Sequence, residues 1–398
     1  MALPIYFRSP LSALMSPVTD DSPDCGKPRK IVVLTSHVFL PSFRKASVHF
    51  VSRNWAELGH DVTFVTVGHS WLSLFKQPKR LKALGIGQRN RFSTIEPGLR
   101  AGAYIPFLHA FSTRNALANR LIKPIFRLYG AHLPRFVREA IAEADVLVFE
   151  SGTAITFFGL AHRLNKTAKT IYFCRDLLSS IGTAPILQET EQRLIGMFDS
   201  VCVPSRRLGQ LLPPGGNVNV IAQGVETKLF DNATQSPYAP GTRNAVAVGD
   251  MLFDQPSVAA MAAAAPDVTF HLFGIYWQGE VPPNIRIYGE RAFETIVAYI
   301  RHADFGLAPY RLSENEVYLA ESSLKLLQYA YCRLPVMLPN LIPATRGNEV
   351  IYSLNEPNDW AAKIAEALSM PRSESFAKSI MTWKGIAAAT LATVEPRG

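Results

Sequence analysis

The sequence has few cysteines, no paired metal-binding motif and no long apolar run. Its four cysteines, in 398 residues, are scattered and form no CxxC pair, which argues against a disulfide framework and suits a reducing cytoplasm. The nine histidines include no HExxH motif and no Cys/His cluster, so no metal site is expected. The longest apolar stretch, Val146 to Leu160, is interrupted by Glu150 and falls short of the roughly 18 apolar residues of a membrane-spanning helix.

The N-terminus lacks the pattern of a cleaved signal peptide. The stretch "MALPIYFRSPLSALMSPVTDD" has two prolines in its first ten residues and no compact basic-then-apolar order. Residues 1–28 are therefore expected to form a flexible tail.

Acidic residues are scarce in one long window. Between Lys76 and Arg138 there are thirteen Lys or Arg residues and a single acid, Glu96, so this window carries +12 against +9 for the whole chain. Charge concentrated in this way indicates an anionic partner. Nucleic acid is not favoured, because the chain has no RRM-type aromatic motif.

Within this window, "NALANRLIKPIFRLYG" has the pattern of a basic amphipathic helix. One face is apolar and the other basic, with Leu117, Leu121, Ile125 and Leu128 opposite Arg120, Lys123 and Arg127. Such a helix can lie on an anionic membrane surface. The alternative is a core helix whose basic side is solvated.

Two series of short apolar segments alternate with helix-length segments, which is typical of an α/β fold with parallel sheets. The first series comprises Lys30–Phe39, a strand within 46–68, Ala144–Gly152, Lys169–Asp176 and Asp199–Ser205. The second comprises Ala245–Met251, Val268–Gly274, Ile285–Glu290, Ala303–Tyr310 and Pro335–Asn340. A chain of this length exceeds a single core of roughly 250–300 residues.

We therefore predict two doubly wound, Rossmann-like domains, 29–230 and 236–375, that face each other across a cleft. The Pro- and Gly-rich stretch Leu212–Asn217, with the looser run to Arg243, is the predicted hinge region. Ligands of open parallel sheets lie beyond the carboxyl ends of the strands. Polar residues gather at those ends in both series.

The stretch "ESSLKLLQYAYCRLPVMLPN" predicts a helix that leads into a buried strand, with a polar stripe of Ser322, Lys325 and Gln328. Ser322 or Ser323 is a natural N-cap. A helix N-terminus with serines and a lysine one turn inside is suited to phosphate, because its free N–H groups and dipole face the anion. A solvated stripe is the alternative.

This stretch is similar to the helix and strand that hold the nucleotide in glycosyltransferases of the GT-B architecture. With "VAVGDMLFD", "IYGE", "FGLAPY", "VLVFESGTA" and "YFCRDLLSSI", the chain more specifically resembles glycosyltransferase family 70, the GumK-like glucuronosyltransferases of xanthan-type exopolysaccharide assembly. Two positions depart from the broad pattern: Gln328 stands where Glu is usual, and Arg333 stands where Gly is usual. If position 333 needs a positive φ, arginine costs about 1 kcal/mol there.

The resemblance implies an inverting, metal-independent transferase without a cofactor that moves glucuronate from UDP-glucuronate to the mannose of a polyprenyl-diphosphate-linked oligosaccharide. The absence of a DxD motif agrees with metal independence. The resemblance places the enzyme peripherally on the cytoplasmic face of the bacterial inner membrane. It makes 29–230 the acceptor- and membrane-facing domain and 236–375 the nucleotide-sugar-binding domain, and 376–398 is expected to pack back on the first. A different UDP-sugar donor or acceptor is the alternative.

The resemblance also implies roles for single residues. Asp176 matches the catalytic base, and the donor-binding positions are Met251, Glu290, Tyr310, Ser322, Ser323, Lys325 and Gln328. Arg44, Lys45 and Glu150 are candidates for the donor carboxylate or the acceptor. The structural alternatives are an N-cap for Asp176, core packing for Tyr310 and solvated loops for Glu290, Arg44 and Lys45.

Overall fold

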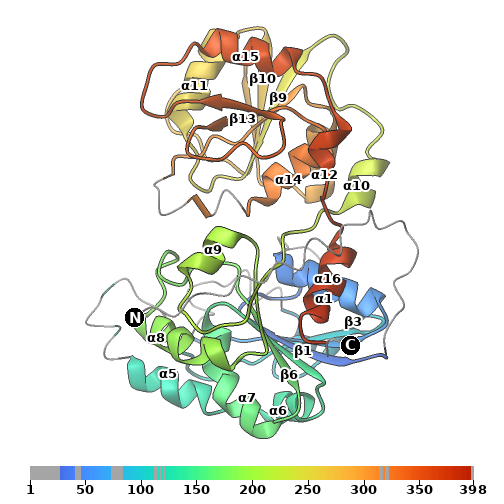
Figure 1. Ribbon diagram of the computed structural model, residues 1–398, viewed down its shortest axis with the longest axis vertical. Coiled ribbons are helices and arrows are strands. Elements are labelled where there is room, and N and C mark those ends of the chain that lie inside the picture. Colours follow the sequence, from blue (N-terminus) through green and yellow to red (C-terminus); the bar gives the residue numbers. More distant parts are fainter. Residues whose placement is uncertain are drawn as a thin grey trace. The chain divides into compact units, whose positions relative to one another are not determined.

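The computed structural model describes residues 27–40, 46–72, 84–111, 115, 119, 122–312, 317–318 and 322–395. It divides into two compact units (Figure 1): unit 1 is Met1–Ala222 with Trp383–Gly398, and unit 2 is Gln223–Thr382. Residues 223–230, which we assigned to the first domain from the sequence, are grouped with unit 2. The Leu212–Asn217 stretch lies inside unit 1, between a helix and a strand. The predicted cleft stays a prediction.

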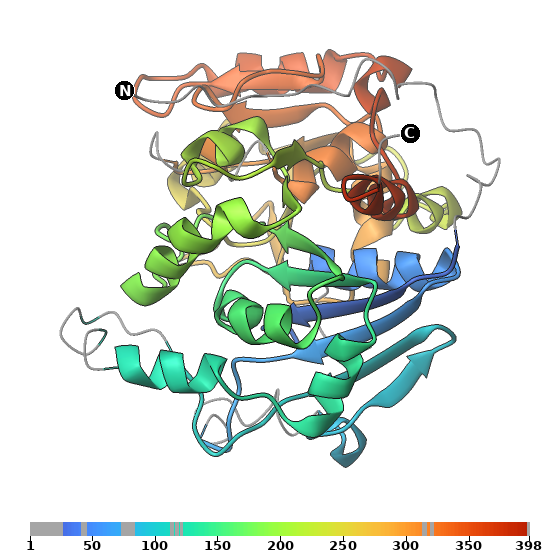
Figure 2. The ribbon, with the colours of Figure 1, turned by 60° about the horizontal axis from the view of Figure 1, so that its bottom comes forward.

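Unit 1 contains an eight-stranded sheet in the order β3-β4-β2-β1-β5-β6-β7-β8. All pairs are parallel except β3 with β4, which lie at one edge and are drawn in cyan in Figure 2. The strands are β1 (Lys30–Thr35), β2 (Asp61–Thr66), β3 (Ser93–Glu96), β4 (Leu99–Ala103), β5 (Val146–Glu150), β6 (Lys169–Phe173), β7 (Ser200–Val203) and β8 (Val218–Val220).

Unit 2 contains a six-stranded, fully parallel sheet in the order β11-β10-β9-β12-β13-β14. Its strands are β9 (Arg243–Val248), β10 (Val268–Phe273), β11 (Ile285–Gly289), β12 (Phe305–Leu307), β13 (Val336–Pro339) and β14 (Glu349–Tyr352). In both sheets the strand order reverses once, between β1 and β5 in unit 1 and between β9 and β12 in unit 2. These are the positions where doubly wound sheets bind ligands.

Helices connect the strands and cover both sheets. Those of unit 1 are α1 (Ser47–Glu57), η1 (Ile86–Gln88), α5 (Lys123–Gly130), α6 (Arg135–Ala142), η2 (Thr153–Phe157), α7 (Phe158–Leu164), α8 (Pro185–Leu194), η3 (Ile195–Met197), α9 (Arg206–Leu211) and α16 (Trp383–Ala392). Those of unit 2 are α10 (Thr227–Asn232), α11 (Gln255–Ala264), α12 (Phe293–His302), α14 (Leu324–Tyr331), α15 (Trp360–Ser369) and η5 (Glu374–Ala377). None of the helices in the described ranges combines the length and apolar character that crossing a membrane requires.

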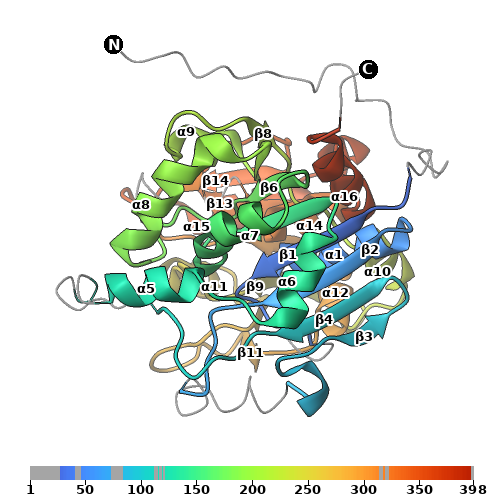
Figure 3. The same cartoon turned by 90° about the horizontal axis from the view of Figure 1, so that it is seen from below.

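The ten strands predicted from apolar runs are all present, and nine of them are largely buried, as a covered parallel sheet requires; the exception is the edge strand β11, where only Ile285 is buried. The final helix, α16, belongs to unit 1 and packs against α1 (Figure 3). There the rings of Phe50 and Trp383 stack with centroids 4.9 Å apart, and Trp55 Nε1 donates to the Ala387 carbonyl over 2.8 Å.

The predicted basic amphipathic helix is only partly described. Helix α5 begins at Lys123, and Leu117, Arg120 and Leu121 lie outside the described residues. Leu128, assigned to the apolar face, is 75% exposed, whereas Phe126 is buried. Phe126, Tyr129 and Gly130 form the face that packs against the rest of unit 1, so Leu128 lies on a different, exposed face of α5 and the membrane role of that face stays a prediction.

Candidate functional site

A group of polar side chains lies where β1, β5 and β6 end, at the reversal point of the unit 1 sheet. We call it the carboxyl cluster: Thr35, His37, Glu150, Arg175 and Asp176. Glu150, the last residue of β5, is 5% exposed and accepts a hydrogen bond from the Thr35 hydroxyl. His37 Nε2 lies 3.6 Å from Glu150 Oε1. Parallel strand ends meet at one edge of a sheet, which brings these residues together.

Arg175 and Asp176 come just after the end of β6, at the same edge of the unit 1 sheet. The Arg175 guanidinium lies 3.6 Å from the centroid of the Phe173 ring, and its Nη1 donates to the Ile221 carbonyl over 3.4 Å. Its Nε and Nη2 are buried and have no hydrogen-bond partner in the described part of the chain. Burial lowers the pKa of Arg175 to about 10, because the charged form loses its hydration.

Burial is also the main influence on both carboxyl groups. It raises the pKa of Asp176, while the charges of His37 and Arg175 lower it in part. Burial also raises the pKa of Glu150 above its ordinary value. The charge of His37 and the hydrogen bond from Thr35 oppose this rise only in part. A raised pKa makes an aspartate a stronger proton acceptor than a solvent-exposed one, which is a common property of catalytic carboxylates.

A second group lies at the N-terminus of α14, beside the reversal point of unit 2. We call it the helix-tip cluster: Tyr310, Ser323 and Lys325. Ser323 is the N-cap, and its hydroxyl accepts the Leu326 N–H over 3.4 Å. The Ser323 and Tyr310 hydroxyls are 2.7 Å apart, and Lys325 Nζ lies 4.7 Å from the centroid of the Tyr310 ring. A cation, a hydroxyl and the N–H groups at the start of a helix therefore converge.

Two loops of unit 2 beside this cluster are joined by a backbone bridge and an ion pair. The loop after β9 and the loop after β12 form a bridge between Phe253 and Tyr310. The buried Asp254 carboxylate accepts from Arg311 Nη2 over 2.7 Å and from the Ser257 hydroxyl over 2.5 Å. The connection fixes the segment that carries Met251, whose side chain is 56% exposed.

Glycines end three adjacent strands of unit 2. Gly249, Gly274 and Gly289 follow or end β9, β10 and β11, and all have a positive φ of 82°, 65° and 64°. No atom lies within 4 Å of a Cβ built on Gly249 or Gly289. The backbone is therefore open at this edge and lets a ligand approach closely.

Comparison with known proteins gives two findings on the sequence. Residues 33–204 match the family model "Glucuronosyltransferase GumK, N-terminal domain". Over 344 residues the chain is 34% identical to the UDP-glucuronate:glycolipid 2-beta-glucuronosyltransferase of Xanthomonas campestris pv. campestris, covering 86% of this chain and 84% of that relative. The chain belongs to the GumK glucuronosyltransferase family.

Solved structures support the fold assigned to this GumK family member. A UDP-forming alpha,alpha-trehalose-phosphate synthase from Burkholderia xenovorans has a TM-score of 0.57 at 11% identity, over 92% of this chain and 98% of that one. Anabaena HepE in complex with UDP and glucose has a TM-score of 0.54 at 13% identity, over 92% and 97%. The predicted α/β GT-B fold is confirmed.

The structure brings some of the predicted site residues together and separates others. Ser322 precedes the cap, and its hydroxyl donates to the Tyr318 carbonyl over 3.0 Å. Gln328 lies one turn further along α14 and is 7% exposed. Glu290 follows β11, two strands from β9, and is exposed. Arg44 and Lys45 lie outside the described residues.

The sequence analysis did not identify several residues that belong to the two clusters or lie beside them. Thr35, His37 and Arg175 were not singled out, although each stands at a strand end, in "TSH" and "FCRD". Asp254 and Arg311 were also missed, because their pairing joins positions 57 residues apart. In the described part of the chain, no three His, Cys, Asp or Glu side chains group as a metal site would require.

Proposed function

We propose that this GumK family member is an inverting glucuronosyltransferase that moves glucuronate from UDP-glucuronate to a glycolipid acceptor. The observation that carries the proposal is the 34% identity, spread over most of both chains, to a UDP-glucuronate:glycolipid 2-beta-glucuronosyltransferase. The two clusters have the chemistry that this reaction needs: a proton acceptor and a site for a diphosphate leaving group.

Asp176 is the proposed base. It accepts the proton of the acceptor hydroxyl as the oxygen attacks the anomeric carbon of the donor. Its raised pKa supports this role, because burial increases the affinity of the carboxylate for a proton. Glu150, beside it at the end of β5, is proposed to contact the acceptor. Its bond from Thr35 fixes one of its oxygens, and the other lies toward His37.

Lys325 and the start of α14 are proposed to stabilise the UDP leaving group. The bond between the anomeric carbon and the diphosphate oxygen breaks as the new glycosidic bond forms, and negative charge grows on that oxygen. The lysine ammonium and the N–H groups after Ser323 neutralise this charge. Ser322 and Ser323 add hydroxyl groups at the same helix end.

The remaining donor contacts are proposed around the same helix. The Tyr310 ring is proposed to stack on uracil, while Gln328 and Glu290 reach sugar or nucleotide polar groups. Met251 places its backbone beside the donor, next to the open Gly249. Arg44 or Lys45 is proposed to pair with the glucuronate carboxylate, because a buried carboxylate requires a cation.

The finer acceptor proposal is the mannose of a polyprenyl-diphosphate-linked oligosaccharide at the cytoplasmic face of the bacterial inner membrane. It is supported by the +12 window and by exposed apolar side chains in two adjacent loops of unit 1. Phe107 is 78% exposed and Trp71 is 44% exposed, and the Trp71 N–H donates to the Pro106 carbonyl over 3.1 Å. Aromatic and basic side chains together suit an anionic membrane surface.

The test is transfer from radiolabelled UDP-glucuronate to glycolipid in a bacterial membrane extract. Label in the lipid fraction is expected with UDP-glucuronate, and UDP-glucose at the same concentration should give at least about tenfold less. Anomeric configuration of the product, read by NMR, should be β. Equal transfer from both donors would overturn the donor assignment, and a retained configuration would overturn the mechanism.

A further inference from the structure

A second polar site of unit 1 lies away from the carboxyl cluster, between α5, η2 with α7, and α8. These elements contact one another, and α5 lies beside α8 in Figures 1 and 3. They enclose a pocket of about 450 Å³, which we call the arginine pocket. Its volume falls within the roughly 300–1,000 Å³ range of small-molecule sites.

Positive charge dominates the wall of the arginine pocket. Its charged lining residues are four cations and one acid, namely Lys123, Arg127, Arg163, Arg193 and Glu189. Lys123 Nζ pairs with Glu189 Oε2 over 2.5 Å. The three arginines pair with no carboxylate among the residues that the structure describes. Three unpaired guanidinium groups on three different helices therefore border one hollow.

Two glycines shape this pocket. At Gly130 a Cβ would lie 2.4 Å from the Thr156 carbonyl oxygen, so only glycine lets α5 approach η2 this closely. At Gly159 the only atom near a built Cβ is Arg163 Nη1, at 3.8 Å. The Arg163 side chain therefore lies along α7, over the surface where Gly159 has no side chain. Arg163 is exposed, and its guanidinium lies at the rim of the hollow.

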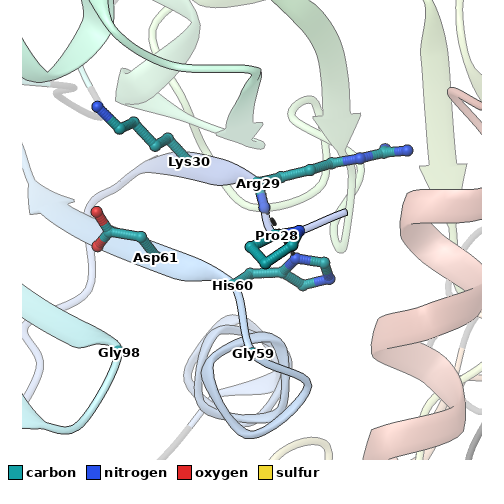
Figure 4. Close-up of a pocket in the computed structure, with 7 residues that line it drawn as sticks. All are labelled: Pro28, Arg29, Lys30, Gly59, His60, Asp61 and Gly98. Carbon is teal, nitrogen blue, oxygen red and sulfur yellow. Dashed lines mark hydrogen bonds between the residues drawn. The ribbon is translucent and has the colours of Figure 1, made fainter. Parts of the chain in front are cut away.

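A second pocket of unit 1, drawn in Figure 4, serves as a comparison for the charges of the arginine pocket. It lies at the opposite, N-terminal ends of β1 and β2. Its two cationic side chains point away from each other and each has a carboxylate partner: Arg29 Nη2 lies 3.0 Å from Glu395 Oε1, and Lys30 Nζ lies 2.8 Å from Glu143 Oε2. Both of these cations have a carboxylate partner, whereas the three arginines of the arginine pocket have none among the described residues.

We propose that the arginine pocket binds a phosphate-type anion through Arg127, Arg163 and Arg193. Guanidinium groups bind phosphate oxygens in pairs, with charge-assisted hydrogen bonds. Glu189 reduces the affinity of the pocket for the anion, because its carboxylate pairs with Lys123. The phosphate group has two possible sources with the same chemistry, a soluble phosphorylated compound or the headgroup of a membrane lipid. This site does not rest on the transferase activity.

The first experiment measures binding of inorganic pyrophosphate to the full chain by calorimetry, with UDP present at saturation so that the helix-tip cluster is occupied. Arg163→Ala and Arg193→Ala should each weaken binding about tenfold, since each removes a charge-assisted contact. Arg135→Ala is the matched control, because Arg135 lies on α6 outside the pocket, is 91% exposed and pairs with Glu139. It should leave the affinity unchanged.

The second experiment identifies the source with vesicles of phosphatidylcholine, alone or with phosphatidylglycerol. Binding to the anionic vesicles that falls in Arg163→Ala and Arg193→Ala, but not in Arg135→Ala, assigns the pocket to a lipid headgroup. Pyrophosphate binding with the same dependence and no effect of the pocket variants on vesicle binding assigns it to a soluble compound. Both results support the anion site.

A gain-of-function variant separates binding from folding. Glu189→Gln removes the only acid of the pocket and releases Lys123, so pyrophosphate affinity should rise about threefold. Damage to the fold would not improve binding. The proposal is overturned if neither probe distinguishes the pocket variants from Arg135→Ala, or if Glu189→Gln weakens binding.

Discussion

The two clusters hold their charges in opposite ways. In the carboxyl cluster of unit 1, Glu150 and Arg175 are buried, and the pKa of every perturbed group is shifted chiefly by lost hydration. In the helix-tip cluster of unit 2, the lysine lies over an aromatic ring at the start of a helix, where the dipole and the N–H groups favour an anion. Burial tunes proton affinity, whereas a helix end presents charge to a ligand. The difference matches a base in one unit and a diphosphate site in the other.

The largest expected effect comes from removing the base. Asp176→Asn keeps the shape of the side chain and removes its ability to accept a proton, so kcat should fall about 10³-fold. UDP affinity, measured by calorimetry, should stay within about twofold, because the change is confined to unit 1. Asp267→Asn is the control, since Asp267 pairs with Arg243 on the exposed surface of unit 2. Near-normal turnover of Asp176→Asn would remove the distinction between the clusters.

The next effect tests the helix tip. Lys325→Ala removes a charge-assisted contact of about 1.5–3 kcal/mol, so UDP should bind about 10- to 100-fold more weakly. Lys325→Arg should restore part of the affinity. Lys363→Ala serves as control, because Lys363 lies on α15 and its charge partner among the described residues is Glu366 on the same helix. An unchanged UDP affinity in Lys325→Ala would place the diphosphate elsewhere.

The fold and the helix tip were predictable because their signals are local. Apolar runs gave the strands, and serine before "LKLLQY" gave the N-cap that the structure places at Ser323. The doubt over position 333 was also justified, since Arg333 has a φ of 55°. Each of these follows from a few neighbouring residues.

The rest depends on contacts between distant parts of the chain. Thr35 meets Glu150 across 115 residues, and no periodicity relates the two. The arginine pocket draws Arg163 and Arg193 from outside the basic window of 76–138, so a count of charge along the sequence could not find it. The edge strand β3, "STIE", is too short and polar to give a strand pattern.

A smaller effect tests whether His37 assists the carboxyl cluster. Its positive charge lowers the pKa of Asp176 and of Glu150, against the larger effect of burial. His37→Gln should therefore raise the pKa of Asp176. Because the base acts only when deprotonated, the acid limb of the kcat/KM profile moves to higher pH. Activity at the low-pH end should fall about threefold, with a plateau unchanged within about twofold.

Two variants check this interpretation of His37. His132→Gln removes an exposed imidazole from the same unit and should leave the profile in place. Burial, His37 and Arg175 shift the pKa of Asp176, whereas Glu150 does not, so Glu150→Gln, which keeps both cations, should leave the acid limb in place. A uniform loss of activity at every pH in His37→Gln would indicate a structural role only.

The smallest effect concerns the other end of α14, and it asks whether function is confined to the helix tip. Arg333 has the left-handed conformation that follows a helix, which costs a non-glycine residue roughly 1 kcal/mol, and its bridge to Glu374 at 3.0 Å is exposed and of small value. Arg333→Gly should raise the midpoint of thermal unfolding of unit 2 by about 2 °C without changing UDP affinity. Arg333→Ala loses the same bridge and keeps the strained conformation, so it should not be stabilised. A change in UDP affinity of Arg333→Gly would show that the geometry of the whole helix, and not its N-terminus alone, determines donor binding.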